Sequence, residues 1–119
     1  MSQSFTQAHR LKKADDFSSV FLFRKSRTGI YLKIYFKPNQ LENSCLGLIV
    51  SKRIHKRANK RNYMKRVLRE LFRTNMSSWV ASYDIVIKVI KLYTHDDFIK
   101  LKEEFTHITK IFHSSKPKN

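Results

Sequence analysis

The spacing of hydrophobic residues along the chain predicts three helices. Each has apolar residues three or four positions apart, which places their side chains on one helix face. In the first, within residues 12–21, these residues are Phe17, Val20 and Phe21. In the second, from Arg57 onward, they are Met64, Val67, Leu68, Leu71 and Phe72. In the last they are Phe98, Leu101, Phe105, Ile108 and Phe112. Thr94, with Asp97 three residues later, is expected to cap that helix.

Three other segments have the pattern of strands. Residues 29–38 alternate, and one side consists of Ile30, Leu32, Ile34 and Phe36. The other side consists of Tyr31, Lys33, Tyr35 and Lys37. Segments 45–51 and 83–91 are mostly apolar, as buried strands are. The order of elements predicts an α+β fold whose helices cover one face of the sheet, and RKSRTG at 24–29 is expected to be a basic turn.

The side of residues 29–38 that carries Tyr and Lys has two interpretations. Aromatic rings and ammonium groups together suit the stacking of bases and the neutralisation of phosphates. The same residues are also typical of an ordinary sheet face, with Tyr favoured by β propensity and Lys by solubility. The strand alone does not decide between them.

Length and composition predict one domain. The chain has 119 residues, of which 41% are hydrophobic, enough for a single core. We expect one domain over 1–119, with mobile ends at about 1–8 and 114–119. The chain has no run of 18 apolar residues, and its N-terminus lacks the apolar stretch of a signal peptide. The lone Cys45 excludes an internal disulfide and is expected to be a buried small hydrophobe. Together these observations favour a soluble protein of the reducing cytoplasm.

The charge balance indicates a polyanionic partner. The chain has 25 Lys and Arg against nine Asp and Glu, a formal net charge of +16. Such an excess destabilises a compact chain unless a polyanion compensates it. Nine of the basic residues lie in 51–72, where Glu70 is the only acid. Like charges four residues apart, such as Arg61 and Lys65, repel each other on a helix, so the segment is expected to bind phosphates.

The acidic and histidine residues form no catalytic or metal-binding pattern. The pairs at 15–16 and 96–97 fall at predicted helix starts, where capping accounts for them, and the pair at 103–104 falls on a helix surface. The five histidines lack metal-ligand spacing, and His55 alone is weak evidence for acid–base chemistry. We therefore expect no catalytic residue and no bound metal, and a protein that positions nucleic acid.

The segment IVSKRIHKRANKRNYMKRVLRELF resembles the signature of the bacterial ribonuclease P protein component. That family has a basic loop, then Arg-Asn-Arg followed by Lys-Arg and Arg-Glu at the start of a long helix. HRLKKADDFSSVF resembles the family's N-terminal stretch, and the resemblance extends along most of the chain. The chain departs from the pattern at Tyr63, where the family usually has the second Arg. A bidentate guanidinium contact is lost there, although Tyr can stack or donate one hydrogen bond, and Lys60 restores the charge.

The resemblance implies a function and a fold. The family is the protein subunit of an endoribonuclease that removes 5′ leaders from precursor tRNA. Its catalytic centre and Mg²⁺ belong to the RNA subunit, so the implied partners are the catalytic RNA and the single-stranded leader. The resemblance implies no cofactor bound by the protein alone. It also implies no membrane partner and no small-molecule substrate. The implied fold is a compact α/β sandwich with three helices, a mostly antiparallel sheet of about four strands and a left-handed βαβ crossover.

The resemblance also assigns residues by position. The surface that binds the RNA subunit would comprise Lys52, Arg53, Lys56, Arg57, Lys60, Arg61, Asn62, Lys65, Arg66 and Arg69. The cleft that binds the leader would comprise Phe17, Phe21, Tyr31, Lys33 and Tyr35. The main alternative is another basic RNA-binding protein of the ribosomal type. A sequence-specific DNA-binding protein is less favoured because the basic helix has few residues suited to reading bases, and a stand-alone nuclease is disfavoured because metal ligands are lacking.

Overall fold

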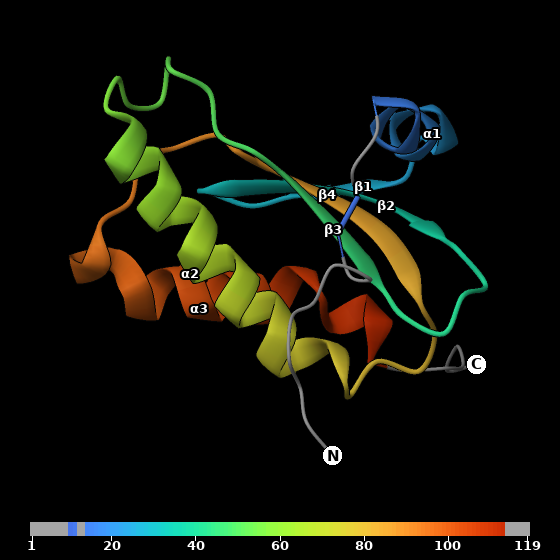
Figure 1. Ribbon diagram of the computed structural model, residues 1–119. Coiled ribbons are helices and arrows are strands. Elements are labelled where there is room, and N and C mark those ends of the chain that lie inside the picture. The colour runs from blue at the N-terminus through green and yellow to red at the C-terminus, as the bar shows by residue number, and fades with distance from the viewer. Residues whose placement is uncertain (1–9, 12–13, 114–119) are drawn as a thin grey trace.

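The computed structural model describes residues 10–11 and 14–113, and both predicted mobile ends lie outside these residues. The elements, in chain order, are α1 (Ala14–Phe23), β1 (Ser26–Thr28), β2 (Leu32–Pro38), β3 (Cys45–Ile49), α2 (Ala58–Met76), β4 (Tyr83–Val89) and α3 (Phe98–Ile108). Short 3₁₀ turns at His95–Asp97 and Lys110–Phe112 flank α3. All six predicted elements are present, so the predicted order of helices and strands is confirmed apart from the added strand β1 (Figure 1).

The strands form one mixed sheet in the order β1-β2-β4-β3. Strand β2 is antiparallel to both β1 and β4, whereas β3 is parallel to β4. The four strands and three helices confirm the implied fold class. Helix α2 makes the crossover between the parallel pair β3 and β4, and the left-handed path expected for it stays a prediction.

The segment expected to be a basic turn contains strand β1. Arg24 has a positive φ of 63°, a left-handed conformation typical of helix ends, and it follows the last residue of α1. Residues Ser26–Thr28 then pair with β2 at the edge of the sheet, and all three are exposed. Because an exposed edge strand has no buried face, it produces no alternation of hydrophobic residues that would predict it.

The helices cover both faces of the sheet. Figure 1 shows α1 on one side of the sheet and α2 with α3 on the other. The expectation of helices on one face is therefore wrong, and the sandwich implied by the resemblance is correct. The sequence of β4 indicates that both faces are covered, because Ile85, Val86 and Ile87 are consecutive apolar residues, and all three are buried. Such a continuous apolar run is typical of a strand buried on both faces.

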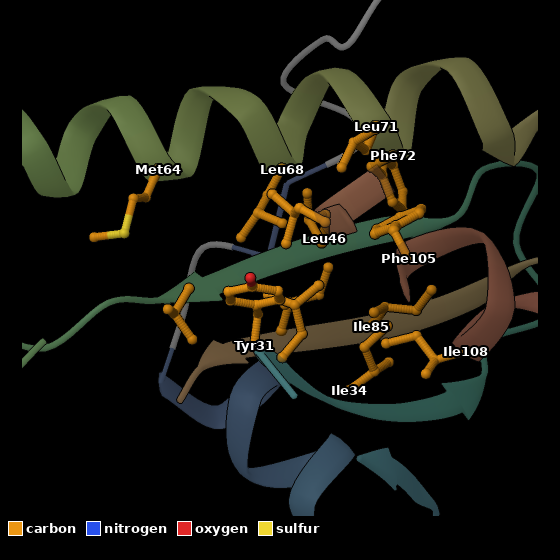
Figure 2. Close-up of a cluster of buried hydrophobic side chains, with 14 of the residues drawn as sticks. Tyr31, Ile34, Leu46, Met64, Leu68, Leu71, Phe72, Ile85, Phe105 and Ile108 are labelled. Carbon is orange, nitrogen blue, oxygen red and sulfur yellow. The ribbon is translucent and has the colours of Figure 1, made fainter. Parts of the chain in front are cut away.

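The main core lies between the sheet and helices α2 and α3 (Figure 2). The predicted apolar stripe of α2 is confirmed, because four of its members are buried and Val67 packs against them. The stripe of α3 is confirmed except at Phe98, whose side chain is 38% exposed. The Thr94 capping box is present, since the Thr94 N–H donates to Asp97 Oδ2 at 3.0 Å. Asp15 and Asp16 do not cap α1, which begins before them, but lie in its first turn.

Strand β2 begins later than predicted because a carboxylate binds the chain just before it. The Glu104 carboxylate accepts hydrogen bonds from the backbone N–H groups of Ile30, Tyr31 and Leu32, at 2.8, 2.9 and 2.8 Å. A Cβ at Gly29 would lie only 2.4 Å from Glu104 Oε2, so glycine leaves room for this carboxylate. The alternation fails at this turn, where Ile30 is 66% exposed and Tyr31 only 7%.

Candidate nucleic-acid interface

An aromatic and basic surface lies on the α1 side of the sheet, and we call its residues Phe21, Lys33, Tyr35 and Lys88 the aromatic face. The rings of Phe21 and Tyr35 meet edge to face, with centroids 4.7 Å apart. The Lys33 Nζ lies 5.0 Å from the centre of the Tyr35 ring, within the range of a cation–π contact. Phe21 is 37% exposed, so helix α1 presents part of that ring to solvent.

Lys88 was not predicted from the sequence, although its signal was present there. It is the register partner of Lys33 across β2 and β4, and register partners share a face of the sheet. It is also the one charged residue within the apolar centre of β4, and it is exposed. The two ammonium groups therefore line the same strip of sheet beside the Tyr35 ring.

Tyr31 does not belong to this face. Its ring lies in the main core and meets the ring of Tyr93 edge to face, with centroids 6.0 Å apart. The prediction that it neighbours Lys33 and Tyr35 on one face is therefore wrong. The cause is the turn held by Glu104, which lies 73 residues away in the sequence and interrupts the alternation.

Phe17 of α1 lies at the β3 edge of the sheet, close to α2. Its ring covers Gly47, where a Cβ would approach the ring to 2.5 Å. It also lines a cavity of about 180 Å³ together with Lys65 and Arg69 of α2. Burial and the nearby charges of Arg10 and Arg66 lower the pKa of Arg69. This junction brings the first helix close to the basic helix.

The residues predicted to bind the RNA subunit lie on α2 and on the loop before it (Figure 1). The exposed members are Lys52, Arg53, Lys56, Arg57, Lys60, Asn62 and Arg66. The half-buried members are Arg61, Lys65 and Arg69. We call these ten residues the basic surface. The Arg73 Nε donates to Glu70 Oε1, and hydrogen bonding from Arg73 lowers the pKa of Glu70.

Arg61 also has a structural role within the basic surface. Its Nη1 donates to the backbone carbonyls of His55 and Lys56, at 2.9 and 2.8 Å. The Arg57 N–H donates to His55 Nδ1 at 3.1 Å. Arg57 is the N-cap residue of α2, and its side chain makes no capping hydrogen bond. The contacts of Arg61 and His55 hold the basic loop against the first turns of the helix. The sequence pattern indicated the charge of Arg61 but not this anchoring role.

The described part of the chain contains no group of three or more His, Cys, Asp or Glu side chains that could hold a metal ion. Within the same residues, no helix is both long and apolar enough to span a bilayer. Burial raises the pKa of the Cys45 thiol to about 11, in line with the buried position expected for this residue.

Comparison with known proteins gives one consistent family. The family model described as Ribonuclease P matches residues 5–113. The ribonuclease P protein component of Aromatoleum aromaticum is 37% identical over 112 residues, which cover 88% of this chain and 93% of that protein. That of Thermotoga maritima is 33% identical and covers 92% of this chain and 97% of its own length.

Solved structures agree with this result. The RNase P protein of Staphylococcus aureus has a TM-score of 0.77 at 26% identity, covering 88% of this chain and 95% of that one. The RNase P protein of Thermotoga maritima has a TM-score of 0.73 at 28% identity, covering 91% of this chain and 98% of that one. Since the family model spans all of the described residues, including α1, the sheet and the basic helix, this protein belongs to the ribonuclease P protein component family.

Proposed function

We propose that this protein acts in tRNA processing by binding the catalytic RNA of ribonuclease P through its basic surface and the 5′ leader of precursor tRNA on its aromatic face. The observation that carries the proposal is the junction at the sheet edge. There Phe17 of α1 lines one cavity with Lys65 and Arg69 of α2. One RNA assembly that covers this edge can therefore contact both α1 and α2. No observation favours the alternative of a different basic RNA-binding protein.

The aromatic face suits a single strand of RNA. Successive bases stack on aromatic rings regardless of sequence, and cations beside the rings neutralise the backbone. The exposed edge of Phe21 and the ring of Tyr35 supply the stacking surface. Lys33 and Lys88 supply two adjacent positive charges on the same strip of sheet. A 5′ leader has the single-stranded form that this arrangement accommodates.

The cleavage chemistry and its Mg²⁺ ions are assigned to the RNA subunit. The described residues offer no cluster of His, Cys, Asp or Glu side chains that could hold a metal ion. The protein supplies fixed positive charge where RNA phosphates meet, and this reduces the repulsion that Mg²⁺ otherwise screens. The protein should therefore lower the Mg²⁺ concentration at which the RNA subunit is active.

Reconstitution tests this proposal. The protein is combined with a bacterial ribonuclease P RNA and a precursor tRNA at low Mg²⁺, and cleavage is compared with that by each component alone. We expect no cleavage by the protein alone and faster leader removal when both are present. Cleavage by the protein alone, or an unchanged RNA reaction, would overturn the proposal.

Charge-matched variants test the basic surface within the same assembly. Arg66 is exposed on α2, and Lys102 is exposed on α3, outside the basic surface. Arg66→Ala should weaken binding to the RNA subunit and reduce the salt dependence of log affinity by about one unit of slope, as expected for one phosphate contact. Lys102→Ala removes the same charge and should leave both quantities near wild type. Equal effects of the two variants would show that only net charge matters.

A further inference from the structure

A cavity of about 610 Å³ opens between the first turns of α2 and the segment that joins β4 to α3. Figure 1 shows these two segments side by side, beyond one end of the sheet. Its lining includes Lys60, Tyr63 and Arg66 from α2, and Leu92 and His95 from the joining segment. The volume falls within the range of about 300–1,000 Å³ typical of small-ligand sites. We call it the Tyr63 pocket.

The apolar part of the Tyr63 pocket has a fixed floor and an open wall. Met64 and Tyr93 form the floor, and their side chains are 1% and 2% exposed. The Tyr93 hydroxyl donates to the Met64 carbonyl at 3.0 Å, which holds that ring in place. Above the floor, Tyr63 is half-buried, whereas Leu92 is 44% exposed despite being fully apolar. The open wall therefore offers a ring and an aliphatic side chain to a flat partner.

The polar part of the Tyr63 pocket is mainly cationic. Lys60 and Arg66 are both exposed and lie six residues apart, nearly two turns, on α2. His55 accepts a hydrogen bond from the Arg57 N–H through Nδ1, which leaves Nε2 available to a ligand. The His95 Nε2 lies 3.6 Å from Asp96 Oδ1. The Asp97 carboxylate accepts the Thr94 N–H at this end of the pocket. A ligand that suits this lining has a flat, weakly polar part and a negative part.

We propose that the Tyr63 pocket takes one unstacked nucleotide of the ribonuclease P RNA. Its base lies against Tyr63 and Leu92, and its phosphate lies near Lys60 and Arg66. This inference rests on the proposed function for the identity of the RNA, but the pocket itself is formed by the protein alone. A simple phosphate site would leave the exposed Leu92 without a role, and an apolar ligand would leave the two cations unneutralised. A nucleotide accounts for both features.

The proposal also gives a role to the position at which the chain departs from the Arg-Asn-Arg pattern. A guanidinium at residue 63 would make a bidentate contact to phosphate, whereas the Tyr63 ring stacks on a base. The positive charge needed for the phosphate is supplied from Lys60, one turn earlier on the same helix. The departure therefore replaces a phosphate contact by a base contact at this point of the surface.

Binding of short RNAs to the full chain tests the pocket. One probe is a tetraribonucleotide with a 2-aminopurine base, and the other has the same phosphates with an abasic site in place of that base. Both are measured in a Phe21→Ala, Lys33→Ala background, which weakens binding at the aromatic face. Tyr63→Ala should weaken binding of the first probe about tenfold, the effect of one lost base–aromatic stack. Binding of the abasic probe should change by less than about twofold.

Two further variants separate stacking from folding. Tyr63→Phe keeps the ring and should bind both probes as well as the background protein. Leu92→Ala truncates the aliphatic side chain of the open wall. Because Leu92 is largely outside the core, this variant should weaken only binding of the base-containing probe. Amide chemical shifts at Tyr63 and Thr94 should move on addition of that probe. Equal losses for both probes, or unchanged binding in Tyr63→Ala and Leu92→Ala, would overturn the pocket proposal. Cleavage by the reconstituted wild-type enzyme does not depend on that result, so the two proposals fail separately.

Discussion

The Glu104 carboxylate is predicted to be one of the main single contributions to the stability of this fold. Glu104 lies on α3, and its carboxylate accepts hydrogen bonds from three backbone N–H groups that lead into β2. Glu104→Ala removes both acceptor oxygens, and with them all three hydrogen bonds. The neighbouring Glu103 is exposed, which makes Glu103→Ala a control with the same charge change on the same helix.

The size of the effect follows from the surroundings of the three donors. The Ile30 N–H is exposed, so water replaces its lost partner, whereas those of Tyr31 and Leu32 are partly buried. A hydrogen bond to a charged group contributes about 1.5–3 kcal/mol, and partial access of water reduces the loss. We expect Glu104→Ala to lower the free energy of unfolding by about 2–4 kcal/mol, a large share of the ~5–15 kcal/mol of a typical domain. Glu104→Gln retains one acceptor oxygen and should lose about half as much.

Urea unfolding followed by tryptophan fluorescence measures this effect. Trp79 is 8% exposed in the folded chain, so its emission should report loss of the core. Glu103→Ala is expected to change the free energy of unfolding by less than about 0.5 kcal/mol. A loss below about 1 kcal/mol in Glu104→Ala, or equal losses in the two alanine variants, would refute the argument that this carboxylate organises the start of β2.

Three other predictions concern the aromatic face, the Phe17 ring and the buried thiol. Phe21→Ala with Tyr35→Ala should weaken binding of precursor tRNA more than of mature tRNA, measured by filter binding; equal losses would make both residues structural. Gly47→Ala places a Cβ against the Phe17 ring, so it should cost about 1–3 kcal/mol in urea unfolding and weaken precursor binding as that ring moves; unchanged stability and binding would show that the ring shifts freely. Because burial raises the pKa of the Cys45 thiol from 9.0 to about 11, its alkylation at pH 8 should be about a hundredfold slower in the folded than in the unfolded chain. Equal alkylation rates at pH 8 would contradict the raised pKa. The same pKa shift stabilises the fold below about pH 9, and this stabilisation is lost as the pH rises to about 11.

Features with strong local periodicity were predictable from the sequence. Helix α2 runs for 19 residues, and its stripe of Met64, Leu68, Leu71 and Phe72 repeats over several turns, so neighbours in the sequence determine its buried face. The concentration of charge on the rest of this helix was equally visible. The sequence alone therefore indicates where the basic surface lies.

Features that depend on distant residues were not predictable in the same way. Tyr31 was assigned to the wrong face because Glu104, on another element, holds the turn before β2. The anchoring role of Arg61 depends on carbonyl groups of a loop whose conformation no periodicity describes. The Tyr63 pocket forms only where α2 meets the segment after β4. In each case the deciding contact joins residues that no local pattern relates.

The hydrogen bonds of Glu104 have a consequence for the order in which a nascent chain folds. The Ile30 N–H donates to Glu104, which lies 74 residues later in the chain. Strand β2 also pairs with β4 rather than with β3, the strand that follows it. Contacts of such long sequence separation slow folding, because loop-closure entropy is lost before they form. During synthesis, α2 can form its own helical turns soon after it leaves the ribosome. The aromatic face, which requires β2 and β4 in register, can assemble only after β4 has emerged, and the turn before β2 is completed only once α3 has followed.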